Sequence, residues 1–209
     1  MASTIARAPT GERLDHLFIV DTVEPGSRVL DLGCGRGVLL KLLVDRKNVR
    51  GTGVEIAEER VYEAVAQGLS VYHGDIDEGL SDYPAGMFDY VIISQTLQQA
   101  RRTVFVMEEV LRVGRRIVVS LPNFAHWKAR AQLLVRGRAP VTKALPYEWY
   151  DTPNIHSVSI KDFRHFAREH HMRIVRDFYL GASGEIRIWP NLRAENAVFV
   201  VERVASQRG

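Results

Sequence analysis

The stretch that decides the fold is "VLDLGCGRG" (residues 29–37), which places three glycines at alternate positions directly after a short apolar run. Residues 28–32 are typical of a buried strand, and residues 37–45 carry the apolar spacing of a helix. Glycines let the backbone turn sharply and come close to a ligand, and the following helix points its positive end at that ligand. The stretch therefore predicts a strand, a ligand-binding loop and a helix.

Strand-like and helix-like segments alternate along the rest of the chain. Strands are expected at residues 28–32, 50–55, 69–73, 88–94, 115–121, 172–180 and 196–204, and helices at 37–45, 58–67, 103–113, 125–136 and 160–170. This alternation predicts an α/β fold with a mostly parallel sheet and helices on both faces. The length of 209 residues fits one domain, with residues 1–10 as a tail and residues 122–158 as an insert after the fifth strand.

Carboxylates at strand ends indicate which ligand the loop binds. The dinucleotide pattern G-x-G-x-x-G is absent, because valine stands where its third glycine belongs. Asp31, at the end of the first strand, suits an ammonium or sulfonium group better than a pyrophosphate. Glu55 lies where an acid accepts the ribose hydroxyls, and Asp75 is placed to accept from an adenine amine, with Ile76 on the ring. Each feature alone also fits a tight turn or a helix cap, but the three together predict a nucleoside cofactor.

The composition narrows the functional classes. The single cysteine, Cys34, cannot form an internal disulfide, so a cytoplasmic protein is expected, and no apolar run reaches the length of a membrane span. No residues have the spacing of metal ligands. Residues 110–147 hold eight basic side chains and no Asp or Glu, yet the net charge is only +3 and no recognition motif is present, which argues against nucleic acid.

The region beyond the fourth strand is where a molecule that reacts with the cofactor would bind. The segment "SQTLQQARR" lacks the Asn/Asp-Pro-Pro-aromatic loop with which some enzymes hold an acceptor nitrogen, and Gln95 is expected to line the cleft. The insert offers aromatic side chains beside His and Asp that can enclose a small acceptor and take its proton. The catalytic candidates are His126, Tyr150 and His156. The alternative is that the insert packs its aromatic side chains on the body and has no catalytic role.

Residues 27–121 together resemble the Rossmann-like class I S-adenosylmethionine-dependent methyltransferases. The resemblance implies a sheet of seven strands with one antiparallel, and S-adenosylmethionine or S-adenosylhomocysteine as the cofactor. It implies Asp31 near the methionine end, Glu55 on the ribose and Asp75 on the adenine amine. The expected cofactor site comprises Asp31, Gly33, Cys34, Gly35, Gly37, Glu55, Ile56, Asp75, Ile76 and Gln95.

A narrower resemblance rests on "SQTLQQARR", on "EEVLRVGRRIVVSLPNFAHWKARAQLLVRGRAPVTKALPYEWYDTPNIH" and on "IKDF". These segments are similar to the MetW family of methionine-biosynthesis proteins, from about residue 29 to residue 180, although glycine is usual where Ala125 stands. The resemblance implies a partner, the homoserine O-acyltransferase MetX, and leaves the chain's own methyl transfer open. Two interpretations therefore remain: an accessory protein that retains a cofactor pocket, and an active methyltransferase on a small acceptor.

Overall fold

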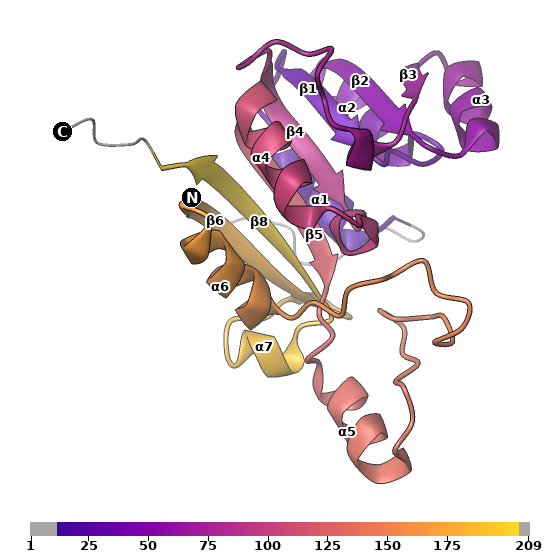
Figure 1. The fold of residues 1–209 in the computed structure, drawn as a ribbon, viewed down its shortest axis with the longest axis vertical. Helices are drawn as coiled ribbons and strands as arrows, with labels where there is room; N and C mark the ends of the chain where they lie inside the picture. Colours follow the sequence, from indigo (N-terminus) through magenta and orange to yellow (C-terminus); the bar gives the residue numbers. More distant parts are fainter. Residues whose placement is uncertain (1–11, 205–209) are drawn as a thin grey trace.

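A computed structural model describes residues 12–204, so the predicted tail at residues 1–10 lies outside the described residues. One eight-stranded sheet runs through the structure in the order β3-β2-β1-β4-β5-β8-β6-β7 (Figure 1). The strands are β1 (Arg28–Leu32), β2 (Arg50–Glu55), β3 (Ser70–His73), β4 (Phe88–Ser94), β5 (Gly114–Pro122), β6 (Met172–Gly181), β7 (Gly184–Glu185) and β8 (Asn196–Arg203). Strands β1 to β5 are parallel, and β8 lies antiparallel between β5 and β6.

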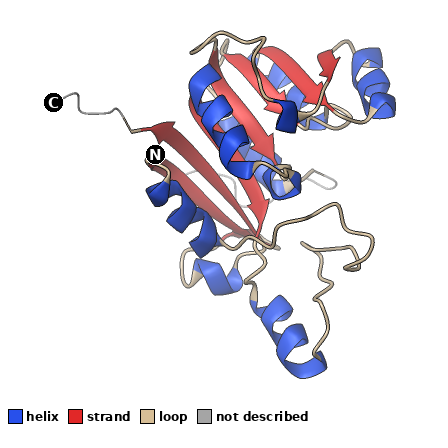
Figure 2. Ribbon diagram, viewed as in Figure 1, coloured by secondary structure: helices blue, strands red, loops and turns tan. Residues whose placement is uncertain are grey.

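Within residues 12–204, helix α1 precedes β1, and six further helices and two 3₁₀ turns connect the strands (Figure 2). They are α1 (Leu14–Thr22), α2 (Val38–Lys47), α3 (Glu58–Ala66), η1 (Ile76–Glu78), η2 (Leu97–Gln99), α4 (Thr103–Val113), α5 (Trp127–Arg136), α6 (Ile160–Glu169) and α7 (Pro190–Arg193). The predicted mostly parallel α/β sheet with helices on both faces is confirmed.

Two apolar layers cover the sheet because successive strand residues point to opposite faces. Val29 packs with side chains of α1 and α2 in one layer. Leu30, the next residue, packs with side chains of α4 and α6 in the other layer. The central strands β1, β4 and β5 are therefore buried on both sides, which explains their continuous apolar sequences.

One strand and two α-helices were not predicted, nor were the two 3₁₀ turns, and the strand count differs. The eighth strand, β7, is only two residues long and pairs with β6, so it has no sequence pattern of its own. Helix α7 has four residues and starts at Pro190. Helix α1 is buried almost all round, from Asp15 to Val20, so it lacks the one-sided apolar stripe that identifies a surface helix.

The topology fixes where a ligand can bind. Strand β1 lies between β2 and β4, so the chain leaves β1 toward one side and returns on the other. Such a switch in strand order opens a crevice at the carboxyl ends of the strands. Within residues 12–204, no helix is both long and apolar enough to cross a membrane.

Candidate functional site

A cleft of about 960 Å³ opens at the switch between β1 and β4. This volume lies at the upper end of the range of small-molecule sites. Its floor is formed by the loop from β1 to α2, in which Gly33 and Gly35 have φ angles of 69° and 57°. Gly37, with a φ of 77°, ends the same loop but is not a lining residue. A Cβ atom on Gly33 would lie 2.5 Å from the side chain of Thr96, whereas a Cβ on Gly35 would meet nothing within 4 Å. Gly33 is therefore required by packing, and Gly35 leaves the cleft open.

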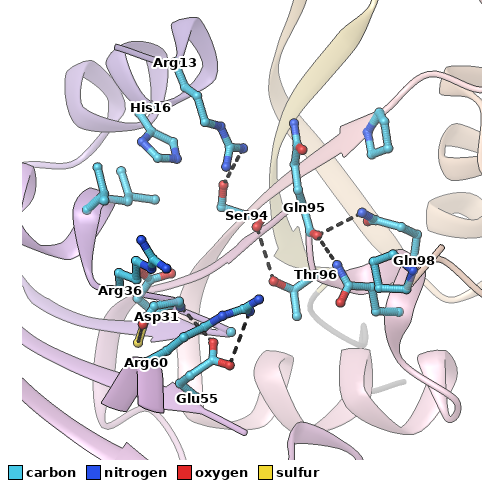
Figure 3. Close-up of a pocket in the computed structure, with 18 of the residues that line it drawn as sticks. Arg13, His16, Asp31, Arg36, Glu55, Arg60, Ser94, Gln95, Thr96 and Gln98 are labelled. Atoms are coloured by element: carbon cyan, nitrogen blue, oxygen red, sulfur yellow. Dashed lines mark hydrogen bonds and ion pairs between the residues drawn. The ribbon is translucent and has the colours of Figure 1, made fainter. Parts of the chain in front are cut away.

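Glu55 joins the end of β2 to this loop. Its side chain is 3% exposed, and Oε2 accepts a hydrogen bond of 2.8 Å from the backbone N–H of Gly35. The other oxygen, Oε1, accepts from the N–H of Ala57 and lies 3.7 Å from Nη1 of Arg60. The carboxylate is held in one orientation at the edge of the cleft (Figure 3).

Asp31 lies in the same cleft and is 1% exposed. Its Oδ2 atom is buried and has no hydrogen-bond partner among the described residues. Burial raises the pKa of the Asp31 carboxyl to about 7; the positive charge of Arg13 opposes this rise and the charge of Glu55 adds to it. An unpaired buried carboxylate is costly, so this site favours a ligand that brings a positive charge or a hydrogen-bond donor.

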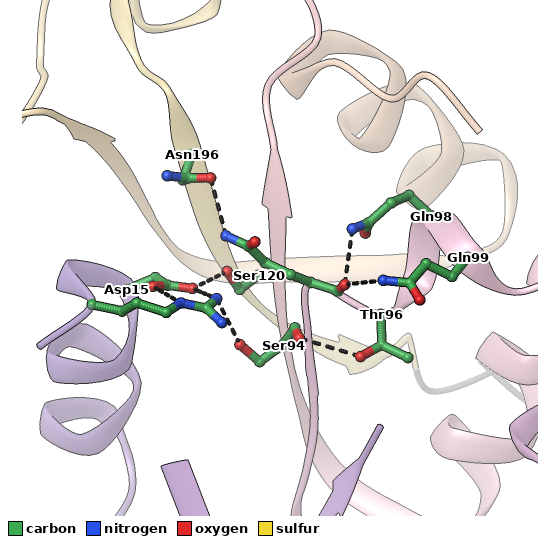
Figure 4. A network of polar contacts seen from close by, with 9 residues as sticks. Asp15, Ser94, Thr96, Gln98, Gln99, Ser120 and Asn196 are labelled. Carbon is green, nitrogen blue, oxygen red and sulfur yellow. Dashed lines mark hydrogen bonds and ion pairs between the residues drawn. The ribbon is translucent and has the colours of Figure 1, made fainter. Parts of the chain in front are cut away.

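Arg13, just before α1, forms one side of the cleft (Figure 3). Its Nε atom donates to the buried carboxylate of Asp15 at 3.1 Å, and Nη2 reaches Oγ of Ser94 at 3.4 Å. Ser120 donates to the same carboxylate at 2.7 Å (Figure 4). Burial raises the pKa of Asp15, but the charge and hydrogen bonds of Arg13, with His16 and Ser120, lower it more. Asp15 is therefore ionised at pH 7 and anchors Arg13.

His16 also lines the cleft from α1. Burial and the charge of Arg13 lower the pKa of His16 to about 4. Its imidazole is therefore neutral at pH 7, and its low pKa makes it a weak general base.

The loop cysteine has a packing role in the structure. Cys34 is buried, and its Sγ atom fills the space beside Gly53, where a Cβ atom would lie 2.6 Å away. Burial, with the charges of Asp31 and Glu55, raises the pKa of the Cys34 thiol to about 12. The thiol is therefore protonated at pH 7 and is not a nucleophile.

The remaining predicted cofactor residues fall into two groups. Ile56 and Gln95 line the cleft. Asp75 and Ile76 are not among its lining residues: Asp75 caps η1 by accepting from the N–H of Asp77 at 2.9 Å, and Ile76 packs against the apolar layer under α4. Their assignment to the adenine ring remains a prediction.

The wall opposite the loop is made of amides. Gln95 adopts a φ of 54°, and its backbone carbonyl oxygen accepts hydrogen bonds from the side-chain amides of Gln98 and Gln99 (Figure 4). The backbone carbonyl of Gln98 in turn accepts from the N–H groups of Ile155 and His156, which fixes the end of the insert beside the cleft. Insert residues also line this wall, and these are Ala144, Pro146, Tyr147, Pro153 and Asn154.

The three catalytic candidates are not among the residues that line this cleft. His126 caps α5 by accepting a 3.4 Å hydrogen bond from the N–H of Lys128. His156 contacts the carbonyl oxygen of Ala100 through Nε2. Tyr150 is exposed and stacks edge-to-face on Trp149. No cluster of three side chains suited to hold a metal occurs within residues 12–204.

Sequence reasoning missed Arg13, His16 and most of the insert residues that line the cleft. Arg13 directly precedes α1 and His16 lies within it; this helix was not predicted, and only the tertiary fold brings the two residues to the cleft. An available signal was the pair of charged residues Arg13 and Asp15 at the start of an apolar segment.

Comparisons with known proteins agree with this architecture. A crystal structure of an S-adenosylmethionine-dependent methyltransferase from Archaeoglobus fulgidus matches with a TM-score of 0.66 and 15% identity over 91% of both chains. The [4+2]-cyclase SpnF matches with the same TM-score and 15% identity, over 90% of this chain and 80% of its own. At such identities the likeness establishes the fold alone.

Sequence relatives are more specific. The bifunctional methionine biosynthesis protein MetXA/MetW of Rhodopirellula baltica is 34% identical over 203 residues, which cover 91% of this chain and 33% of the relative. The chain thus spans about a third of that relative's length. The profile of the family described as methionine biosynthesis protein MetW matches residues 13–201. The chain belongs to the MetW family.

Proposed function

We propose that the protein binds S-adenosylmethionine or S-adenosylhomocysteine in this cleft and acts in methionine biosynthesis, in the cytoplasm, as an accessory of the homoserine O-acyltransferase MetX. The observation that carries the cofactor assignment is the buried, unpartnered Oδ2 atom of Asp31. A sulfonium or ammonium group beside it compensates the cost of that buried carboxylate.

The residues of the cleft fit the two ends of such a cofactor. At the amino-acid end, Asp31 is positioned to accept from the ammonium group and Arg13 to donate to the carboxylate. Both line the cleft, and the two charges are close enough for Arg13 to oppose the raised pKa of Asp31. At the nucleoside end, Glu55 accepts from the ribose hydroxyls and Ile56 offers an apolar surface to the base. Asp75 and Ile76 are proposed at the far side of the adenine.

The chemistry of the cleft favours an accessory role. Bound S-adenosylmethionine supplies an electrophilic methyl group. A hydroxyl or amine that accepts a methyl group must lose a proton, so it needs a base nearby. His16 is a poor base at pH 7, and the opposite wall offers the amides of Gln95, Gln98 and Gln99. The carboxylates of Asp31 and Glu55 also line the cleft, but in this proposal both are engaged by the cofactor itself. None of the proposed catalytic histidines is a lining residue.

The partner assignment rests on the relative from Rhodopirellula baltica. Its name joins MetXA and MetW in one bifunctional chain, and this chain matches a third of it. Two activities fused in one polypeptide are held at high effective concentration, so separate chains of the same two kinds are expected to meet as a complex.

A second candidate function is methyl transfer to a small acceptor. The observation in its favour is the cleft volume of about 960 Å³, which leaves space beside the cofactor. A carboxylate acceptor needs no base, so this reaction remains compatible with the residues of the cleft.

Co-purification tests the proposal. A tagged homoserine O-acyltransferase of the same organism is expected to co-purify with the untagged protein. The acyltransferase is expected to be more active in the presence of this protein, and the increase is expected to depend on added S-adenosylmethionine. Transfer of labelled methyl to small acceptors is measured in the same samples. Absence of a complex with or without S-adenosylmethionine contradicts the accessory role, and methyl turnover without a complex favours the second candidate.

A further inference from the structure

Helix α5 extends away from the sheet and is followed by a long loop (Figures 1 and 2). Ala129 is the only one of its ten residues that is buried. Leu134 and Val135 are 87% and 80% exposed, and Leu133 and Trp127 are about half exposed. The sequence predicted a helix here, and in the structure every residue of α5 except Ala129 is exposed or partly exposed.

An isolated helix of this length is marginal in water, because most helical stability in proteins comes from packing of an apolar face. Clustered exposed apolar side chains usually mark an interaction site. Leu133, Leu134 and Val135 are three consecutive exposed apolar residues in the last turn of α5. Because consecutive residues lie about 100° apart around a helix, they surround the end of α5 with apolar surface rather than forming a stripe on one face. The loop adds Trp149 and Tyr150, each 72% exposed, whose rings stack edge-to-face.

The insert is nevertheless held in a defined shape. The side chain of Gln132, in the middle of α5, both donates to the carbonyl oxygen and accepts from the N–H of Val141, each at 2.9 Å. His126 caps the start of α5, and Gly137 ends it in the left-handed conformation. The apolar residues are therefore presented on a pre-organised element, which lowers the entropic cost of binding.

Charge decides what kind of surface can cover α5. Five exposed cations of the insert have no ion pair among residues 12–204, and these are Lys128, Arg130, Arg136, Arg138 and Lys143. The stretch 110–147 holds no carboxylate to balance them. A second copy of this face would bring like charges together, which costs binding energy. A groove edged by carboxylates provides the complementary charge.

We propose that α5 docks, through Leu133, Leu134 and Val135, into an apolar groove edged by carboxylates on the acyltransferase partner. This inference rests on the proposed function for the identity of the partner. It places the interface on the insert, where the apolar end of α5 enters a groove and its cations contact the acidic rim.

The test compares two sets of variants, with the same organism's homoserine O-acyltransferase as the binding partner. The first is Leu134→Gln with Val135→Gln, which keeps a good helix former at both positions. Its control is Val65→Gln with Val104→Gln, two exposed valines on α3 and α4. The second set reverses Lys128, Arg136 and Arg138 to Glu, with Arg50, Lys161 and Arg203 reversed to Glu as its control; all three control residues are exposed.

Dissociation constants are measured by calorimetry at low and high salt, and self-association by light scattering. We expect the α5 variants to raise Kd by at least about tenfold, the charge reversals to reduce its salt dependence, and both controls to stay within about twofold of wild type.

Each contrary outcome has a distinct meaning. If the wild type binds and the α5 variants bind equally well, the docking site is wrong while the accessory role stands. If the wild type does not bind the acyltransferase at all, the proposed accessory function is wrong, and so is the proposal that the acyltransferase covers α5. If the wild type forms dimers that the α5 variants abolish, a second copy covers the helix and the proposal is overturned.

Discussion

The carboxylate of Glu55 accepts a hydrogen bond from the backbone N–H of Gly35 at 2.8 Å, so the end of β2 fixes the position of the glycine loop. The same carboxylate also accepts a hydrogen bond from the backbone N–H of Ala57. One side chain thus orders both the loop and the start of α3, beside the place proposed for the ribose. Replacing it changes the shape of the site as well as its charge.

The first prediction follows from this arrangement. Glu55→Ala is expected to weaken binding of S-adenosylhomocysteine by roughly 1–3 kcal/mol, because charge-assisted hydrogen bonds are lost and two N–H groups lose their acceptor. Glu55→Gln retains one acceptor oxygen, so its affinity for S-adenosylhomocysteine is expected to lie between those of Glu55→Ala and the wild type. Calorimetry measures both affinities. Unchanged binding in Glu55→Ala, or binding of NAD in place of S-adenosylhomocysteine by the wild type, contradicts the assignment.

Gly35 provides a second prediction. Its φ of 57° strains any other residue, and a Cβ atom there faces open space in the cleft. Gly35→Val is expected to abolish cofactor binding at a modest cost in stability, of about 1–2 kcal/mol. Gly68→Val is the matched control, because Gly68 also has a positive φ and free space but does not line the cleft. Thermal unfolding should show similar losses for both variants. Retained affinity in Gly35→Val would place the cofactor elsewhere.

The third prediction concerns pH. Because the pKa of Asp31 is about 7 in the folded protein and 3.8 in model compounds, the folded state binds the extra proton between these values. The free energy of unfolding attributable to Asp31 therefore falls as pH rises from about 4 to 7, and Asp31→Asn removes this loss. A cationic ligand prefers the ionised carboxylate, so its affinity should rise about tenfold between pH 6 and pH 8.

Calorimetry across this pH range checks the prediction, with Asp31→Asn as the reference for titration of the ligand itself. His16 has a pKa near 4, so its titration lies below the window. A pH dependence of the same slope in Asp31→Asn would show that another group is responsible.

The part of this site that the sequence reveals is the part built from local patterns. The alternating apolar strands, the glycines at 33, 35 and 37, and Glu55 at a strand end are all visible in the sequence, because each follows from neighbouring residues. Helix α1 was missed since burial on every side removes its periodicity. The exposure of Leu134 and Val135 was also not predictable, because the sequence does not tell whether an apolar helix face finds a partner within its own chain.

The last prediction separates binding from stability at Arg13. If Arg13 holds the carboxylate of the cofactor, Arg13→Gln should weaken the binding of S-adenosylhomocysteine by about 1–3 kcal/mol. The binding of methylthioadenosine, which lacks the amino-acid end, should be unaffected. The substitution also leaves the buried carboxylate of Asp15 with Ser120 as its remaining side-chain donor, so the protein should lose stability.

The double variant Arg13→Gln with Asp15→Asn resolves the two effects. Removing the buried charge together with its partner should restore much of the melting temperature, since a neutral side chain no longer needs the guanidinium. It should not restore S-adenosylhomocysteine affinity, because the donor to the carboxylate is still absent. Binding that recovers along with stability would mean that Arg13 supports the cleft only through Asp15 and makes no contact with the cofactor.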